Sequence, residues 1–263
     1  MERLRLILLG LAGLVIVGLV LQEHYPSLRP VQALALTAGA GAGAGVASAV
    51  PVSYLADPNT SAYFSALKDA LPQEYQGIVR KISSVHDAVA PVGAPDALAF
   101  AMRRLREDYG VLAGRAPIDN LDRITDAQRA ILAALAGISP AACVDFYEGR
   151  PSAALTSFTS SHNALMLALA NADLAAISAG RGQSDVPAQP TATDFAALTK
   201  ALQKAGLDAA MIGLLVDGKM PANKPSDDVL CGAVGKYLGA VRSLATDIRL
   251  RLIARSVILA AAS

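Results

Sequence analysis

Apolar positions near the end of the chain recur with a helical period. Seven apolar residues follow one another at spacings of three or four: Leu230, Val234, Tyr237, Val241, Leu244, Ile248 and Leu252. That spacing places all seven on one face of an α-helix. Ser226 precedes them as a candidate N-cap, and Asp227 and Asp228 suit the positive end of a helix. The pattern predicts one continuous amphipathic helix that forms the spine of the core.

Shorter segments of the same period lie upstream, separated by proline and glycine. Pro72 ends one expected helix and opens the next, because proline is tolerated only in the first helical turn. Ser139 and Pro140 form an N-cap with proline at the first helical position. Thr125 to Gln128 matches a capping box, which predicts a helix that begins at Thr125. Gly137 follows as its C-cap.

The segments between these signals define the expected fold. A long helix is expected to carry Leu165, Leu169 and Ile177 on its buried face and to end at Gly180. Residues 180–193 contain several glycines and prolines and few apolar residues, which indicates a flexible loop or a boundary between two lobes. Alternating strand-like runs do not occur in the sequence. We therefore expect an all-α fold, a bundle of about seven to nine helices over residues 57–263.

The N-terminus has the pattern of a membrane anchor or a signal segment. Residues 1–22 contain an uncharged apolar run from Leu6 to Leu21, preceded by Arg3 and Arg5. The run is just long enough to cross a bilayer and slightly long for a signal peptide. The positive-inside rule places the two arginines in the cytoplasm and the body outside. We expect a single-pass bacterial inner-membrane protein with its body in the periplasm.

Residues 23–56 are rich in glycine and alanine and leave three interpretations open. They form a tether behind a retained anchor, they end in a signal-peptidase site at Ala47-Ser48-Ala49, or Ala33 to Val52 forms a weak second span. Cleavage near Ala49 would release the body into the periplasm. Gly39 to Ala44 also matches a dinucleotide-binding pattern, but low complexity explains that match. We expect no cofactor and no metal site.

Composition adds two constraints. Hydrophobic residues make up 53% of the 263 residues and charged residues 17%, and the apolar mass is mainly Ala, Leu and Val, which favours helices. The net charge of +1 supplies no global field to attract nucleic acid.

The chain has two cysteines, Cys143 and Cys231, without a C-x-x-C motif. In an oxidising periplasm they are expected to form a disulfide, and in a reducing cytosol to stay buried thiols.

Two groups of polar residues are candidates for chemistry or binding. Asp145 and Glu148 lie on one helix face with Arg150 as a nearby counter-ion, and His162 follows a serine-rich run. Together they are weak candidates for acid–base work, since a solvated, locally paired face is the commoner reason for such residues. A basic cluster near the C-terminus is the second group: Arg242, Arg249, Arg251 and Arg255. These cations suit a helix C-terminus, anionic lipid headgroups or an acidic partner helix.

The apolar segment after this cluster, SVILAAAS, is expected to fold into the core. The leading functional hypothesis is a non-enzymatic binding or scaffold module tethered to the inner membrane, with a protein partner on the C-terminal amphipathic helix. The alternatives are a carrier of an apolar small ligand, because alanine-rich helices leave room between them, and, less favoured, an envelope hydrolase that uses Asp145, Glu148 and His162.

Overall fold

The computed structural model describes residues 57–86 and 94–261, and every regular element within these ranges is an α-helix. The expected anchor, the tether and the Ala49 site lie outside the described residues. The described helices follow one another in this order: α2 (Pro58–Ala70), α3 (Pro72–His86), α4 (Ala94–Ala113), α5 (Ile118–Ala136), α6 (Pro140–Glu148), α7 (Ala153–Ser161), α8 (Asn163–Arg181), α9 (Ala192–Lys204), α10 (Ala209–Asp217), α11 (Asp227–Arg242) and α12 (Thr246–Ala261). The all-α prediction is therefore confirmed for the described part of the chain.

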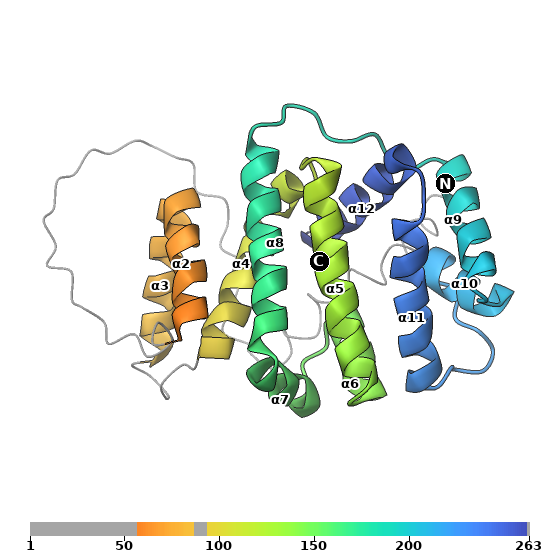
Figure 1. The fold of residues 1–263 in the computed structure, drawn as a ribbon, viewed down its shortest axis with the longest axis horizontal. Coiled ribbons are helices and arrows are strands. Elements are labelled where there is room, and N and C mark those ends of the chain that lie inside the picture. Colours follow the sequence, from red (N-terminus) through yellow and green to blue (C-terminus); the bar gives the residue numbers. More distant parts are fainter. Residues whose placement is uncertain (1–56, 87–93, 262–263) are drawn as a thin grey trace, which may run out of the picture.

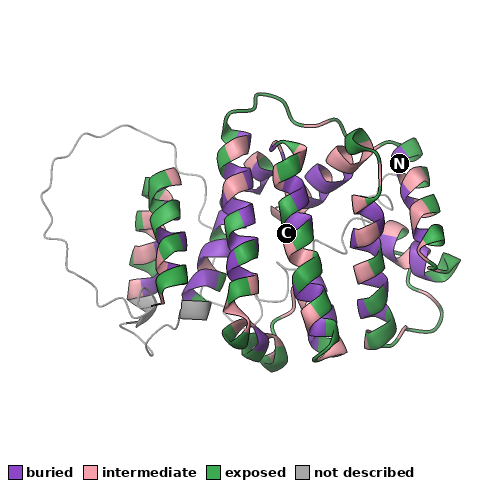
Figure 2. Ribbon diagram, in the orientation of Figure 1, coloured by how far each residue is buried: buried purple, intermediate pink, exposed green. Residues whose placement is uncertain are grey.

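Helix α8 is the central element of the bundle. It packs against α4, α5 and α2, while α12 crosses α4 and α5. The α2–α3 pair lies at one side of the bundle, and α9 and α10 lie at the other side beyond α11 (Figure 1). Buried positions line the inner faces of α4, α5 and α8, and exposed positions line their outer faces (Figure 2). The spine of the core is thus α8 rather than the C-terminal helix that the sequence favoured.

Helix α8 is also the described helix whose length and apolar composition suffice to cross a membrane. Half of its apolar window is buried inside the bundle. Its apolar side chains, Leu169 and Ile177 among them, pack in the core with those of the neighbouring helices. The helix therefore has the packing of a core helix.

The described residues contain eleven helices instead of about seven to nine, and two divisions of the chain contribute to the difference. The first division falls at His162, whose backbone leaves the helical region at φ −121° and ψ 39° and separates α7 from α8. The residues before it are hydroxyl-bearing, and their side chains bond to backbone carbonyls: Ser160 Oγ donates to Thr156 O at 3.1 Å. Such side chains compete with regular helix hydrogen bonds, so this stretch is a weak point in the helix.

The second division separates α11 from α12 at residues 243–245, within the predicted continuous stripe. Ser243 Oγ donates to Ala240 O at 2.8 Å, and the Arg249 guanidinium donates to Leu244 O at 3.1 Å. These bonds satisfy carbonyls that a continuous helix would have paired with its own amides. The apolar spacing predicted one continuous helix here; its helical period is confirmed, but the predicted continuity is wrong.

Several other predicted helix ends are confirmed, but the predicted start of α5 is not. Ser139 Oγ accepts from Ala142 N–H at 3.2 Å, Pro72 separates α2 from α3, and Gly137 is the C-cap of α5. The predicted start at Thr125 is wrong, since α5 begins at Ile118. Thr125 is buried inside that helix, and its hydroxyl donates back to Leu121 O at 3.2 Å.

Glycines allow three helices to cross at close range. A Cβ at Gly180 would lie 1.8 Å from Leu112 O, and a Cβ at Gly114 would lie 2.4 Å from Ile258 Cγ1. The close contact between α4 and α8 is therefore at Gly180 of α8, and the close contact with α12 is at Gly114, the residue directly after α4. Of the C-terminal apolar segment, Ser256 is buried and residues 257–261 are half-buried, so the expected burial in the core is reached only in part. Residues 262–263 lie outside the described residues.

Replacing Gly180 with alanine should destabilise the fold by about 2–3 kcal/mol, because the added methyl meets backbone atoms of α4 that cannot rotate away. Urea unfolding followed by circular dichroism measures this change. Gly182→Ala is the matched control, since a Cβ there meets nothing closer than Ala179 O at 3.7 Å. An equal effect of the two substitutions would contradict the close crossing.

Replacing glycines of α11 with alanine should raise the free energy of unfolding, the opposite of the effect at Gly180. Cβ atoms built at Gly232, Gly235 and Gly239 meet no atom within 4 Å. Alanine has a higher helix propensity than glycine by up to about 1 kcal/mol. Gly232→Ala and Gly239→Ala should therefore each raise the free energy of unfolding by roughly 0.5–1 kcal/mol in the same urea assay. A loss of stability in either variant would show that something packs against this face.

Candidate functional site

The two candidate carboxylates of α6 are held by one arginine. Arg150 Nη2 lies 3.1 Å from Asp145 Oδ1 and 2.8 Å from Glu148 Oε2. Arg150 follows Gly149, the left-handed C-cap of α6, so the turn brings the guanidinium back beside the two carboxylates. Both carboxylates therefore share one cation from the turn that follows α6. These ion pairs stabilise the C-terminal end of the helix.

His162 contacts residues at the end of α7, the helix that precedes it. Its Nδ1 lies 2.9 Å from Ser161 Oγ and 3.3 Å from Phe158 O. The imidazole stacks on the Phe158 ring, with the ring centroids 4.3 Å apart. In the described part of the chain, no hydrogen bond or ion pair joins His162 to Asp145 or Glu148. The three residues that the sequence grouped as acid–base candidates thus have separate local partners.

The predicted basic cluster is divided between carboxylates of two other helices, α5 and α9. Arg242 Nη1 lies 2.5 Å from Asp122 Oδ2, and Arg249 Nε lies 2.9 Å from Asp122 Oδ1. Arg242 also donates to both oxygens of Asp126, at 2.9 and 3.1 Å. The hydrogen bonds to Asp126 are the largest cause of the raised pKa of Arg242, and the pairing with Asp122 raises that pKa further. The two arginines join α11 and α12 to α5.

Arg251 forms a bidentate pair with a buried carboxylate, Asp194. Its Nε and Nη2 donate to the two oxygens of Asp194, at 2.8 and 2.7 Å. The Arg251 guanidinium holds the pKa of Asp194 well below its usual range, and hydrogen bonds from Thr191 lower it further. Asp194 also closes the capping box of α9 with Thr191, so this pair joins α12 to the start of α9. Arg255 alone of the four has no ion pair among the described residues.

A buried ion pair that the sequence did not predict lies at the junction of α2, α4 and α8. Arg106 Nε and Nη2 lie 2.9 and 2.8 Å from Asp173 Oδ2. Burial raises the pKa of Asp173, although the Arg106 charge opposes that shift. The hydroxyl of Tyr63, also buried, has no hydrogen-bond partner in the described structure. Asp173 is a single acidic residue in an apolar stretch, and its partner is 67 positions earlier, so spacing gave no signal.

Polar contacts at both ends of α2 join it to α8. Asn163 Nδ2, at the start of α8, lies 3.4 Å from Asp57 Oδ2 at the start of α2. Arg181 Nη1, at the end of α8, donates to Ala70 O at 3.0 Å. The two helices therefore run parallel, with the Arg106–Asp173 pair between these contacts.

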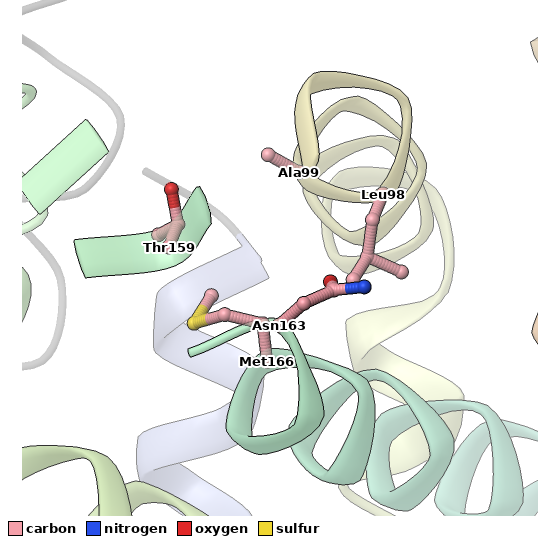
Figure 3. A pocket seen from close by; sticks show the side chains of 5 residues that line it. All are labelled: Leu98, Ala99, Thr159, Asn163 and Met166. Atoms are coloured by element: carbon pink, nitrogen blue, oxygen red, sulfur yellow. The ribbon is translucent and has the colours of Figure 1, made fainter. Parts of the chain in front are cut away.

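One small pocket lies between α4, α7 and α8 (Figure 3). Leu98, Ala99, Thr159, Asn163 and Met166 line it, and its volume is about 10 Å³. That space holds about one water molecule. Asn163 Oδ1 is buried without a hydrogen-bond partner in the described structure, so a water there would have a polar neighbour. The pocket does not fit the apolar ligand of the carrier hypothesis.

The two cysteines form a disulfide between α6 and α11. The Cα atoms of Cys143 and Cys231 are 5.7 Å apart, and both residues are buried. The bond joins segments 88 positions apart in the sequence. Among the described residues, no group of three His, Cys, Asp or Glu side chains is arranged to hold a metal ion.

Comparison of the chain with protein-family models, curated proteins and solved structures finds no match.

Proposed function

We propose that the chain is a non-enzymatic binding or scaffold protein of the bacterial envelope, anchored in the inner membrane by its N-terminal segment, with the helical body in the periplasm. The Cys143–Cys231 disulfide carries most of this proposal. Disulfides persist in oxidising compartments and are rare in the cytosol. An anchor with its positive residues inside puts the body on the oxidising side of the membrane.

The contacts of the candidate acid–base residues support the non-enzymatic part. Asp145 and Glu148 both pair with Arg150, and the imidazole of His162 contacts Ser161 and Phe158. A general base must reach a substrate proton within hydrogen-bond distance. Side chains with local partners support a structural role more than a catalytic one.

Intact mass measured on fractionated cells tests the proposal, with thiols alkylated before and after reduction. We expect a mass that begins at Met1 in the membrane fraction, with both thiols unreactive until reduction. A mass that begins near Val50 in the soluble fraction would support cleavage at Ala49 and a released periplasmic protein. Free thiols on a soluble chain that still begins at Met1 would contradict both.

A further inference from the structure

Lysine and arginine are used differently in the last third of the chain. Arg242, Arg249 and Arg251 are paired with carboxylates inside the fold. The lysines of α9 and α11 are exposed, and they have no ion pair among the described residues: Lys200, Lys204 and Lys236. We call these three residues the lysine patch.

The fold brings the lysine patch together from two helices. Lys200 and Lys204 are one turn apart on α9, so they project from the same side of that helix. A Cβ built at Gly206, two residues after Lys204, would lie 3.9 Å from Lys236 Nζ. The nearest acidic residue in the sequence, Asp208, has its Oδ1 bonded to Met211 N–H at 2.7 Å as the N-cap of α10.

An exposed apolar side chain follows later in the sequence, between two further lysines. The loop between α10 and α11 carries Met220, which is 72% exposed, and Lys219 and Lys224. Lys219 pairs with Asp217 at 3.1 Å, and both side chains are mostly exposed. Basic residues beside an exposed apolar side chain are typical of a surface that rests on anionic lipid headgroups.

We propose that the lysine patch docks the body on the anionic phospholipid headgroups of the membrane in which the chain is anchored. This inference rests on the proposed function, because the anchor keeps the body beside a membrane surface. Charge complementarity selects the headgroup phosphate as the occupant. Each lysine near an anionic leaflet strengthens attachment by about fivefold at low salt, and salt weakens it within a Debye length.

The test uses the full chain reconstituted in two kinds of vesicle, phosphatidylcholine alone and phosphatidylcholine with phosphatidylglycerol. The readout is the rate of amine acylation at Lys200, followed by mass spectrometry, with Lys68 on α2 as the internal reference. We expect Lys200 to be protected severalfold on the anionic vesicles at low salt, and the protection to be lost at high salt. Lys68 should react equally on both.

Two variants identify the cause of that protection. Lys204→Gln with Lys236→Gln leaves Lys200 as the reporter and should weaken attachment roughly thirtyfold, which removes most of its protection. Arg80→Gln with Arg123→Gln removes two exposed cations on α3 and α5 and should leave the protection of Lys200 unchanged, while Lys68 remains as the internal reference.

Four outcomes overturn the inference. Equal acylation of Lys200 on the two vesicles does so, as does equal protection in the patch variant and the parent chain. Protection by inorganic phosphate on phosphatidylcholine vesicles would assign the patch to free anions instead. Failure of the chain to sediment with either vesicle overturns the proposed anchor as well, whereas sedimentation without protection overturns the docking alone.

Discussion

Replacing Arg106 with methionine should cost about 3–4 kcal/mol of stability at neutral pH, because the buried Asp173 carboxylate then loses its only cation in the described structure. The Asp173 side chain is 9% exposed and the Arg106 side chain 31%. Methionine keeps much of the apolar packing of the arginine stem, so the loss reports mainly the charge. Urea unfolding followed by circular dichroism measures it.

The stability lost in the Arg106→Met variant should depend on pH, and the direction of that dependence can be stated. Burial already raises the pKa of Asp173 above its ordinary value of 3.8, so the folded state binds the proton more tightly than the unfolded chain. Stability from this group therefore falls as pH rises from the unfolded pKa through the folded pKa. Without Arg106 the pKa of Asp173 in the folded state rises further. The loss of stability relative to the parent chain should therefore shrink as the pH is lowered toward the ordinary carboxyl pKa of 3.8.

Two further substitutions separate this explanation from a general loss of charge. Arg104→Met removes an exposed arginine that pairs with Asp108 at 2.8 Å on the same helix, and it should cost less than about 0.5 kcal/mol. Arg106→Met combined with Asp173→Leu should recover most of the stability, since no unpaired charge then remains. A deficit at Arg106 that is independent of pH, or equal to that at Arg104, would contradict the buried-pair account.

Removing the disulfide with Cys143→Ala and Cys231→Ala should lower stability by about 4 kcal/mol. The physical reason lies in the unfolded chain, because a bond between positions 88 apart removes conformational freedom that the variant regains. The thermal midpoint of the variant should equal that of the parent chain treated with reductant. A reductant that lowers the midpoint of the variant itself, or a parent chain insensitive to complete reduction, would contradict this account.

Helix type and most helix ends could be predicted from the sequence because they depend on nearby residues. The Ser139 cap, the stop at Pro72 and the apolar stripe of α11 are all set within a few positions. The end of α11 was not predictable in this way. Arg249 bonds to Leu244 O and also pairs with Asp122, which is more than a hundred positions away.

In the candidate site, too, contacts between sequence neighbours were predictable and contacts between distant segments were not. The sequence placed Asp145, Glu148 and Arg150 together correctly, since they are neighbours on one turn. It placed four arginines in a cluster, but the structure pairs three of them with carboxylates of other segments. A charge pattern read along one helix cannot reveal neutralisation across the fold. The Arg106–Asp173 pair was missed for the same reason.

The segment between α8 and α9 acquires a particular property from the disulfide. Residues 183–191 have no regular structure, and most of their side chains are exposed. The segment lies inside the loop of chain that Cys143 and Cys231 close. A protease that cuts there leaves two fragments covalently joined, so the nicked molecule migrates as one species until its thiols are reduced. A single backbone cut in this segment therefore does not allow the two fragments to dissociate while the disulfide is intact.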